Sequence, residues 1–265
     1  MNDRRQPPQP FAGALLGALV VATSMVSADP AVDSILSRIY DGYDQQNACW
    51  RARSETPGGF CCLKIDRQDR IETASGQRLY VLLAGGCFDS EGKPEDTHVS
   101  TGMIGALAIG IGPNEISILA GDPRMPMGSY GVAPTGWTLV KLGPADYWGW
   151  LNTFGYTGQG RTESVYLILA PYGKRIRDLG GEGRIKAGFD DAGACDEEDR
   201  CPTTALETKL DIDSLQLDAK VFPLLITVTG QIEGRPIAPK TWTLPFDPDS
   251  WTYVEPDDWP LAADE

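Results

Sequence analysis

The sequence DYWGWLNTFGYTGQG, residues 146–160, sets five aromatic side chains among four glycines, between segments that favour β-strands. Two interpretations fit this composition. The segment is either a glycine-hinged loop that presents rings to a ligand, or the aromatic core of a β-rich module. If the segment is extended, Trp148 and Trp150 lie on one face, because side chains alternate along a strand. The question is then whether that face points inward or outward.

The surrounding sequence repeats a pattern of short apolar segments separated by turn residues. Strands are predicted at 60–65, 70–73, 78–84, 103–111, 115–120, 137–142 and 164–170. The polar run DRQDR, residues 66–70, is interpreted as a turn between the first two strands. Short strands in series predict an antiparallel β sandwich or barrel and not βαβ units. The predicted fold class is therefore mainly β (α+β), with one N-terminal helix.

That helix is predicted from a cap signal followed by helical periodicity. Asp29 is a good N-cap, and Pro30 suits the first helical position, where its missing N–H has no partner to lose. Apolar residues then recur at helical spacing from Val32 to Tyr43. We expect the helix to run to about Gln45.

Residues 1–28 have the features of a secretory signal peptide. Arg4 and Arg5 precede an apolar run at 11–26, and small residues before Ala28 suit signal peptidase. The run is shorter than the roughly 20 residues that cross a bilayer. We therefore expect cleavage after Ala28, a periplasmic or secreted location, and no membrane contact beyond the signal peptide.

An even number of cysteines in an exported chain predicts disulfides. The six are Cys49, Cys61, Cys62, Cys87, Cys195 and Cys201. The last two bracket a short acidic loop and are predicted to pair. Adjacent residues on a strand point to opposite faces, so a bond between the neighbours at 61 and 62 would be strained. Two pairings stay open, in which Cys49 takes one neighbour and Cys87 the other.

The segment KRIRDLGGEG, residues 174–183, has the charge and glycine content of a domain boundary. We predict an N-terminal helix plus antiparallel β module at 29–181. A smaller acidic β unit with an extended C-terminal strap follows at 182–265. Within it, LDIDSLQLD alternates apolar and polar residues with one phase slip, which predicts a bulged strand within 206–218.

The net charge of −14 at pH 7 argues against a nucleic-acid partner and against anionic membranes. Acidic residues at 190–199 offer oxygen ligands for calcium, but the loop does not match an EF-hand. Zinc is not expected either, because the chain has no CxxC spacing and a single histidine. We therefore predict no metal and no cofactor.

His98 is the single histidine, so histidine-based catalysis would have to use it. Asp96 and Ser100 are too close along an extended loop to form a catalytic relay with it. No G-x-S-x-G elbow is present. His98 is therefore a catalytic candidate only under an alternative hypothesis, in which the protein is an envelope hydrolase.

Elimination leaves the aromatic stretch as the candidate ligand-binding site, through Tyr147, Trp148, Trp150 and Tyr156. The favoured hypothesis is an exported, disulfide-stapled, non-enzymatic module that recognises a protein or glycan partner in the cell envelope. A further alternative is an inhibitor or immunity-type protein whose acidic C-terminal surface contacts a basic partner.

Overall fold

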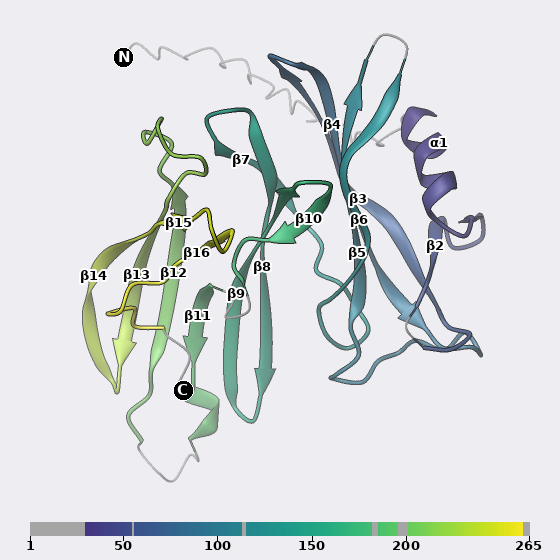
Figure 1. Cartoon of the computed structure of the whole chain (residues 1–265). Coiled ribbons are helices and arrows are strands. Elements are labelled where there is room, and N and C mark those ends of the chain that lie inside the picture. Colours follow the sequence, from purple (N-terminus) through teal and green to yellow (C-terminus); the bar gives the residue numbers. More distant parts are fainter. Residues whose placement is uncertain (1–29, 55, 113–114, 182–184, 196–200, 262–265) are drawn as a thin grey trace, which may run out of the picture.

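The computed structural model describes residues 30–54, 56–112, 115–181, 185–195 and 201–261. The predicted fold class is confirmed, since the chain is mainly antiparallel β with one short N-terminal helix. Six strands form one sheet, here called sheet A, and eight form a second, sheet B; two short strands pair separately. In Figure 1 the helix lies on the side of sheet A away from sheet B.

Sheet A follows the order of the chain, so that each strand pairs with the next. Its strands are β1 (Tyr43–Asp44), β2 (Cys49–Arg53), β3 (Phe60–Thr73), β4 (Gly76–Phe88), β5 (Gly102–Ile111) and β6 (Ile116–Met127). The turn predicted at 66–70 is wrong, because these residues lie inside β3. A register shift between Ile65 and Arg67 marks a β-bulge that absorbs Asp66 and lets the strand continue.

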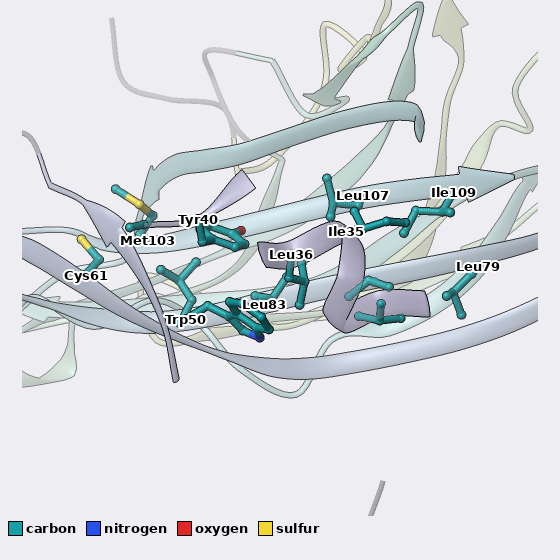
Figure 2. Packing of buried hydrophobic residues seen from close by; sticks show 14 of the residues in the cluster. Ile35, Leu36, Tyr40, Trp50, Cys61, Leu79, Leu83, Met103, Leu107 and Ile109 are labelled. Atoms are coloured by element: carbon teal, nitrogen blue, oxygen red, sulfur yellow. The ribbon is translucent and has the colours of Figure 1, made fainter. Parts of the chain in front are cut away.

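Helix α1 (Pro30–Ile39) packs on the outer face of sheet A, where Figure 2 shows Ile35 and Leu36 among strand residues such as Leu83 and Leu107. The helix ends at Ile39 and not near Gln45 as predicted. Gly42, with φ of 135°, turns the chain into β1. The predicted N-cap at position 29 lies outside the described residues.

Sheet B combines strands from most of the second half of the chain. They are β7 (Thr138–Gly143), β8 (Tyr147–Gly158), β9 (Arg161–Tyr172), β10 (Arg175–Asp178), β11 (Lys186–Asp190), β12 (Ala205–Ile212), β13 (Leu224–Ile232) and β14 (Arg235–Leu244). A single 3-10 turn, η1 (Ala192–Ala194), is described between β11 and β12. Because β9 pairs with β11, the sheet runs across the boundary predicted near residue 182. Separate folding of the two segments stays a prediction.

The strand predicted within 206–218 is correct only in its first part. β12 ends at Ile212, and the carboxylate of Asp213 accepts a hydrogen bond from the backbone N–H of Leu215 at 3.3 Å. Leu215 and Leu217 are 86% and 72% exposed in the turns that follow. The phase slip in the sequence therefore marks the end of a strand and not a bulge within it.

Sheets A and B stack through a shared apolar core. At its centre Tyr80 of β4 meets Trp150 of β8 edge to face, with ring centroids 5.6 Å apart. At one side, the Asp66 carboxylate accepts hydrogen bonds from the backbone N–H groups of Gly136 (2.9 Å) and Trp137 (3.0 Å). At the other side, Arg175 of β10 forms a 2.6 Å ion pair with Asp122 of β6. The apolar core and the Arg175–Asp122 ion pair thus join the two sheets, and Asp66 joins sheet A to the segment that precedes β7.

The C-terminal segment, residues 245–261, covers the face of sheet B that points away from sheet A. It contains β15 (Phe246–Asp247) and β16 (Thr252–Tyr253), which pair with each other. Trp259 is buried and meets Trp242 of β14 edge to face at 5.6 Å. A hydrogen bond from Lys240 holds the pKa of Asp258 below its usual value, and Trp242 donates to the same carboxylate.

Three disulfides are present: Cys49–Cys62, Cys61–Cys87 and Cys195–Cys201. The predicted local pair is confirmed, and one of the two open pairings is selected, because Cys61 and Cys87 lie opposite each other in the β3–β4 register. Three disulfides fit a protein of an oxidising compartment. The predicted signal peptide lies outside the described residues, and export stays a prediction. No helix in the described part of the chain has the length and apolar character needed to span a membrane.

Two glycines in the connection from β6 to β7 give a matched test of the packing. Gly131 and Gly136 both have positive φ, of 69° and 79°. A Cβ on Gly131 would lie 1.7 Å from the carbonyl oxygen of Glu95, whereas a Cβ on Gly136 would meet nothing within 4 Å. Both alanine variants carry the same backbone strain, so we expect Gly131→Ala to cost about 1–3 kcal/mol more of the free energy of unfolding than Gly136→Ala. Urea unfolding measures this difference, and equal losses would contradict the predicted clash.

Candidate functional site

The aromatic stretch forms β8 and the turn into β9, so it is extended. Trp150 is fully buried between the sheets, and the partly buried Trp148 packs against the same core. The face that these two rings share therefore points inward, toward sheet A. Their indole N–H groups have no hydrogen-bond partner among the described residues.

The other two predicted site residues lie apart from this pair. Tyr147 packs on the opposite face of sheet B, where its hydroxyl donates to the carbonyl oxygen of Pro171 at 2.7 Å. Burial raises the pKa of Tyr147 to about 12. Tyr156 is 42% exposed near the far end of β8. The structure thus does not gather the four rings on one surface, and ligand binding by them stays a prediction.

His98 lies exposed in the loop between β4 and β5. Within the described part of the chain, its imidazole takes part in no hydrogen bond and no ion pair. The nearby hydroxyls of Thr97 and Ser100 bond to each other at 2.6 Å. No geometry here favours the hydrolase alternative.

The acidic loop at 196–199 lies outside the described residues. Elsewhere in the described chain, no three His, Cys, Asp or Glu side chains are grouped so that they could hold a metal ion.

A cavity of about 550 Å³ lies between α1 and the edge of sheet A. This volume falls in the range of small-molecule binding sites. We call it the α1 cavity. Its lining residues are Asp33, Tyr43, Gln45, Ala48, Trp50, Leu63, Lys64 and Ile65.

The α1 cavity exists because β2 is much shorter than β3. The last residue of β3 that pairs with β2 is Leu63, opposite Trp50, yet β3 continues for ten more residues. Ala48, with φ of 50°, turns the chain away at that point. The carboxylate of Asp44 stabilises the turn by accepting backbone N–H bonds from Gln46 and Asn47, each at 3.0 Å. The space beside β3 where β2 would have continued is left open.

One wall of the cavity is aromatic and its rim is polar. Trp50 is 8% exposed and belongs to the core beneath α1, while Tyr43 is 44% exposed and meets it edge to face at 5.1 Å. Lys64 is exposed at the rim and has no ion-pair partner in the described part of the chain. Asp33 of α1 adds a carboxylate. Such a site can stack an apolar ligand face on a ring while rim groups form hydrogen bonds.

A second cavity, of about 440 Å³, also has Lys64 in its lining. Here Phe60 and Phe88 stack with centroids 5.2 Å apart and ring planes 18° apart. The guanidinium of Arg51 lies 3.8 Å from the centre of the Phe60 ring. Lys64 therefore stands between two sites that each contain an aromatic pair.

The sequence interpretation missed the α1 cavity because it assigned Tyr43 to the helix. The signal that would have revealed it is Gly42, a residue that commonly ends a helix. Trp50 was not singled out, although CWRAR has the alternation of a half-buried strand.

Comparison of the chain with models of known protein families, with curated proteins and with solved structures found no match.

Proposed function

We propose that this protein is an exported, non-enzymatic binding module that recognises a glycan of the cell envelope in the α1 cavity. The observation that carries the proposal is the half-exposed ring of Tyr43, held edge to face by the buried Trp50 beside a cavity with a polar rim. A sugar ring has an apolar face that stacks on an aromatic side chain, and hydroxyls at its edge that both donate and accept hydrogen bonds. The three disulfides support a role outside the reducing cytosol.

The dimensions of the site favour a glycan over a protein surface. A stable protein–protein interface covers roughly 800 Å² on each partner and usually includes a flat apolar centre. The α1 cavity is instead a small concave site in which Asp33, Gln45 and Lys64 supply both acceptors and donors. This mixture matches the hydroxyl groups of a sugar better than the apolar side chains of a protein partner.

Replacing the exposed ring tests the proposal. We expect Tyr43→Ala to weaken glycan binding at least about ten-fold, because it removes the stacking surface and part of the buried apolar area. Tyr43→Phe should retain most of the affinity. Binding is measured by titration calorimetry against soluble peptidoglycan fragments and a panel of envelope polysaccharides.

Tyr156→Ala is the matched control, because Tyr156 is 42% exposed but lies on β8, away from the cavity. It should bind like the unmodified protein. If Tyr156→Ala loses binding and Tyr43→Ala does not, the site lies on the aromatic stretch and the proposal is wrong. If no glycan binds but an envelope protein is retained through Tyr43, the ligand class is wrong.

A further inference from the structure

Strand β3 has a long free edge. It pairs with β4 from Phe60 to Thr73, but with β2 only from Phe60 to Leu63. From Lys64 onward, the strand pairings of the described chain give β3 no neighbour on the β2 side. A free strand edge presents unpaired N–H and C=O groups and is a template for another strand.

Two other sheet edges contain residues that block such pairing. β6 contains Pro123 and Pro126, and β14 contains Pro236 and Pro239. Proline has no N–H to donate to a neighbouring strand. The free part of β3 contains no proline. The free part of β3 contains instead positively and negatively charged residues in a self-complementary order.

The sequence KIDRQDRIE, residues 64–72, is charge-complementary to itself when reversed. Counting outward from Gln68, Arg67 matches Asp69, and Asp66 matches Arg70. Ile65 then matches Ile71, and Lys64 matches Glu72. Two antiparallel copies centred on Gln68 would therefore set Arg67 of each copy opposite Asp69 of the other, with Gln68 opposite Gln68.

We propose that a second copy of this chain pairs with the free edge of β3, antiparallel and about a two-fold axis at Gln68. Sheet A of one protomer would then continue into sheet A of its partner. The interface is isologous, since the same strand serves both protomers.

The positions of the side chains support the three central pairs. Arg67 and Asp69 lie opposite Leu82 and Tyr80 in the β3–β4 register, and both of these β4 residues face sheet B. Arg67 and Asp69 therefore share one face, where the guanidinium binds the carboxylate through two hydrogen bonds of 2.6 and 2.8 Å. Two such strands would bring together four charges of alternating sign. The bulge at Asp66 reverses the alternation of the side chains before it, so Ile65 and Ile71 pack on different faces of sheet A. The proposal therefore rests on the three central pairs.

The charges also select the register. Directly opposed residues must share a face of the sheet, so the two-fold axis passes through a residue and not between two. Centring the pair on Arg67, Asp69 or Arg70 would oppose two like charges, which is unfavourable. Among these neighbouring positions, Gln68 alone gives complementary pairs.

The environment of Gln68 supports the proposed two-fold axis independently of the charges. It lies opposite Val81 and thus on the α1 face of sheet A, and its side-chain oxygen Oε1 is buried with no hydrogen-bond partner among the described residues. A buried acceptor without a partner destabilises a fold. At the two-fold axis the amide of the partner's Gln68 would face it and could donate the missing bond.

The test is sedimentation equilibrium of the full exported chain with its disulfides intact. We expect a concentration-dependent dimer. Arg67→Asp should weaken dimerisation at least about ten-fold, because two attractive pairs become two repulsive ones. The double variant Arg67→Asp with Asp69→Arg restores the pattern, and its dissociation constant should return to within about three-fold of the original.

Crosslinking gives a second measurement that does not depend on these charges. In the proposed pairing, residue 68 faces its own copy at a Cα separation of about 4.5–5.5 Å, which suits a disulfide. Gln68→Cys should therefore form a covalent dimer on oxidation. Glu72→Cys should not, because the two copies of position 72 would be about 26 Å apart along the strands.

Three results would overturn the proposal: a chain that stays monomeric at all concentrations, a dimer unaffected by Arg67→Asp, or a dimer that Gln68→Cys does not crosslink. None of these variants changes a residue that lines the α1 cavity. Because the partner's strand would lie beside Lys64 and Ile65 of that lining, glycan binding is measured at concentrations where the chain is monomeric, and its result is independent of the dimerisation tests.

Discussion

Trp150→Ala is expected to lower the free energy of unfolding by about 3–5 kcal/mol, the usual cost of deleting a large buried aromatic side chain. Trp150 is 0% exposed, and its ring meets Tyr80 in the core that joins the two sheets. Removing it leaves a void that neither sheet can fill without moving. Because whole domains are stable by only about 5–15 kcal/mol, the variant should be close to unfolding at 37 °C. Urea unfolding followed by far-UV circular dichroism measures the loss.

Alanine substitutions at two other residues of β8 are the comparisons for Trp150→Ala. Trp148 is only partly buried, so Trp148→Ala should cost less than Trp150→Ala. Tyr156→Ala, at an exposed position, should change stability by no more than about 0.5 kcal/mol. A Trp150→Ala protein with unchanged stability but lost ligand binding would show that the packing argument is wrong and that the aromatic stretch is a binding site.

Removing the Cys61–Cys87 disulfide should have an effect of similar size. The bond joins residues 26 apart in sequence, and closing a loop of this length stabilises a fold by about 3–4 kcal/mol through the unfolded chain. Both cysteines are buried, where the start of β3 pairs with the end of β4. We therefore expect the double variant Cys61→Ala with Cys87→Ala to lose at least that much free energy of unfolding. Thermal and urea unfolding of the oxidised proteins measure it.

The Cys195–Cys201 bond is the matched control. It joins residues only 6 apart, for which the same relation gives about 2 kcal/mol, and its Cys201 is exposed. The variant Cys195→Ala with Cys201→Ala should therefore be the more stable of the two. The reverse order would mean that the acidic loop, and not sheet A, depends most on its disulfide.

The fold class was predictable because its signals are local. Short apolar segments between glycine and proline turns specify antiparallel strands without knowledge of their neighbours. The disulfides were nearly predictable for the same reason. Opposite-facing neighbours at Cys61 and Cys62 exclude one pairing, but only the β3–β4 register, which sets Cys61 opposite Cys87, decides between the other two.

The sequence predictions were wrong at segments whose composition is compatible with two different local structures. DRQDR is polar enough for a turn, yet charged side chains are also what an exposed edge strand carries. Tyr43 continues the helical spacing of α1, but Gly42 ends the helical conformation first. In LDIDSLQLD, leucines at 215 and 217 keep a strand-like spacing after the strand has ended.

The location of the candidate site could not be predicted from the spacing of apolar residues along the sequence. Alternation places Trp148 and Trp150 on one face of a strand, but the direction of that face is set by where sheet A packs. The α1 cavity depends on the unequal lengths of β2 and β3, which no single segment encodes. The direction of the tryptophan face and the presence of the α1 cavity both depend on contacts between different segments of the chain.

The nearest-neighbour order of sheet A has a consequence for how the chain matures. If the chain is exported as the sequence predicts, translocation from the N-terminus delivers β1 to β6 first, and each strand finds its partner in the segment just before it. Both sheet A disulfides can therefore close before β7 has emerged. The apolar face of sheet A that later receives Trp150 is bare during that interval. In an exported chain, the interval between the arrival of β6 and that of β8, which carries Trp150, would therefore leave apolar surface exposed and favour aggregation.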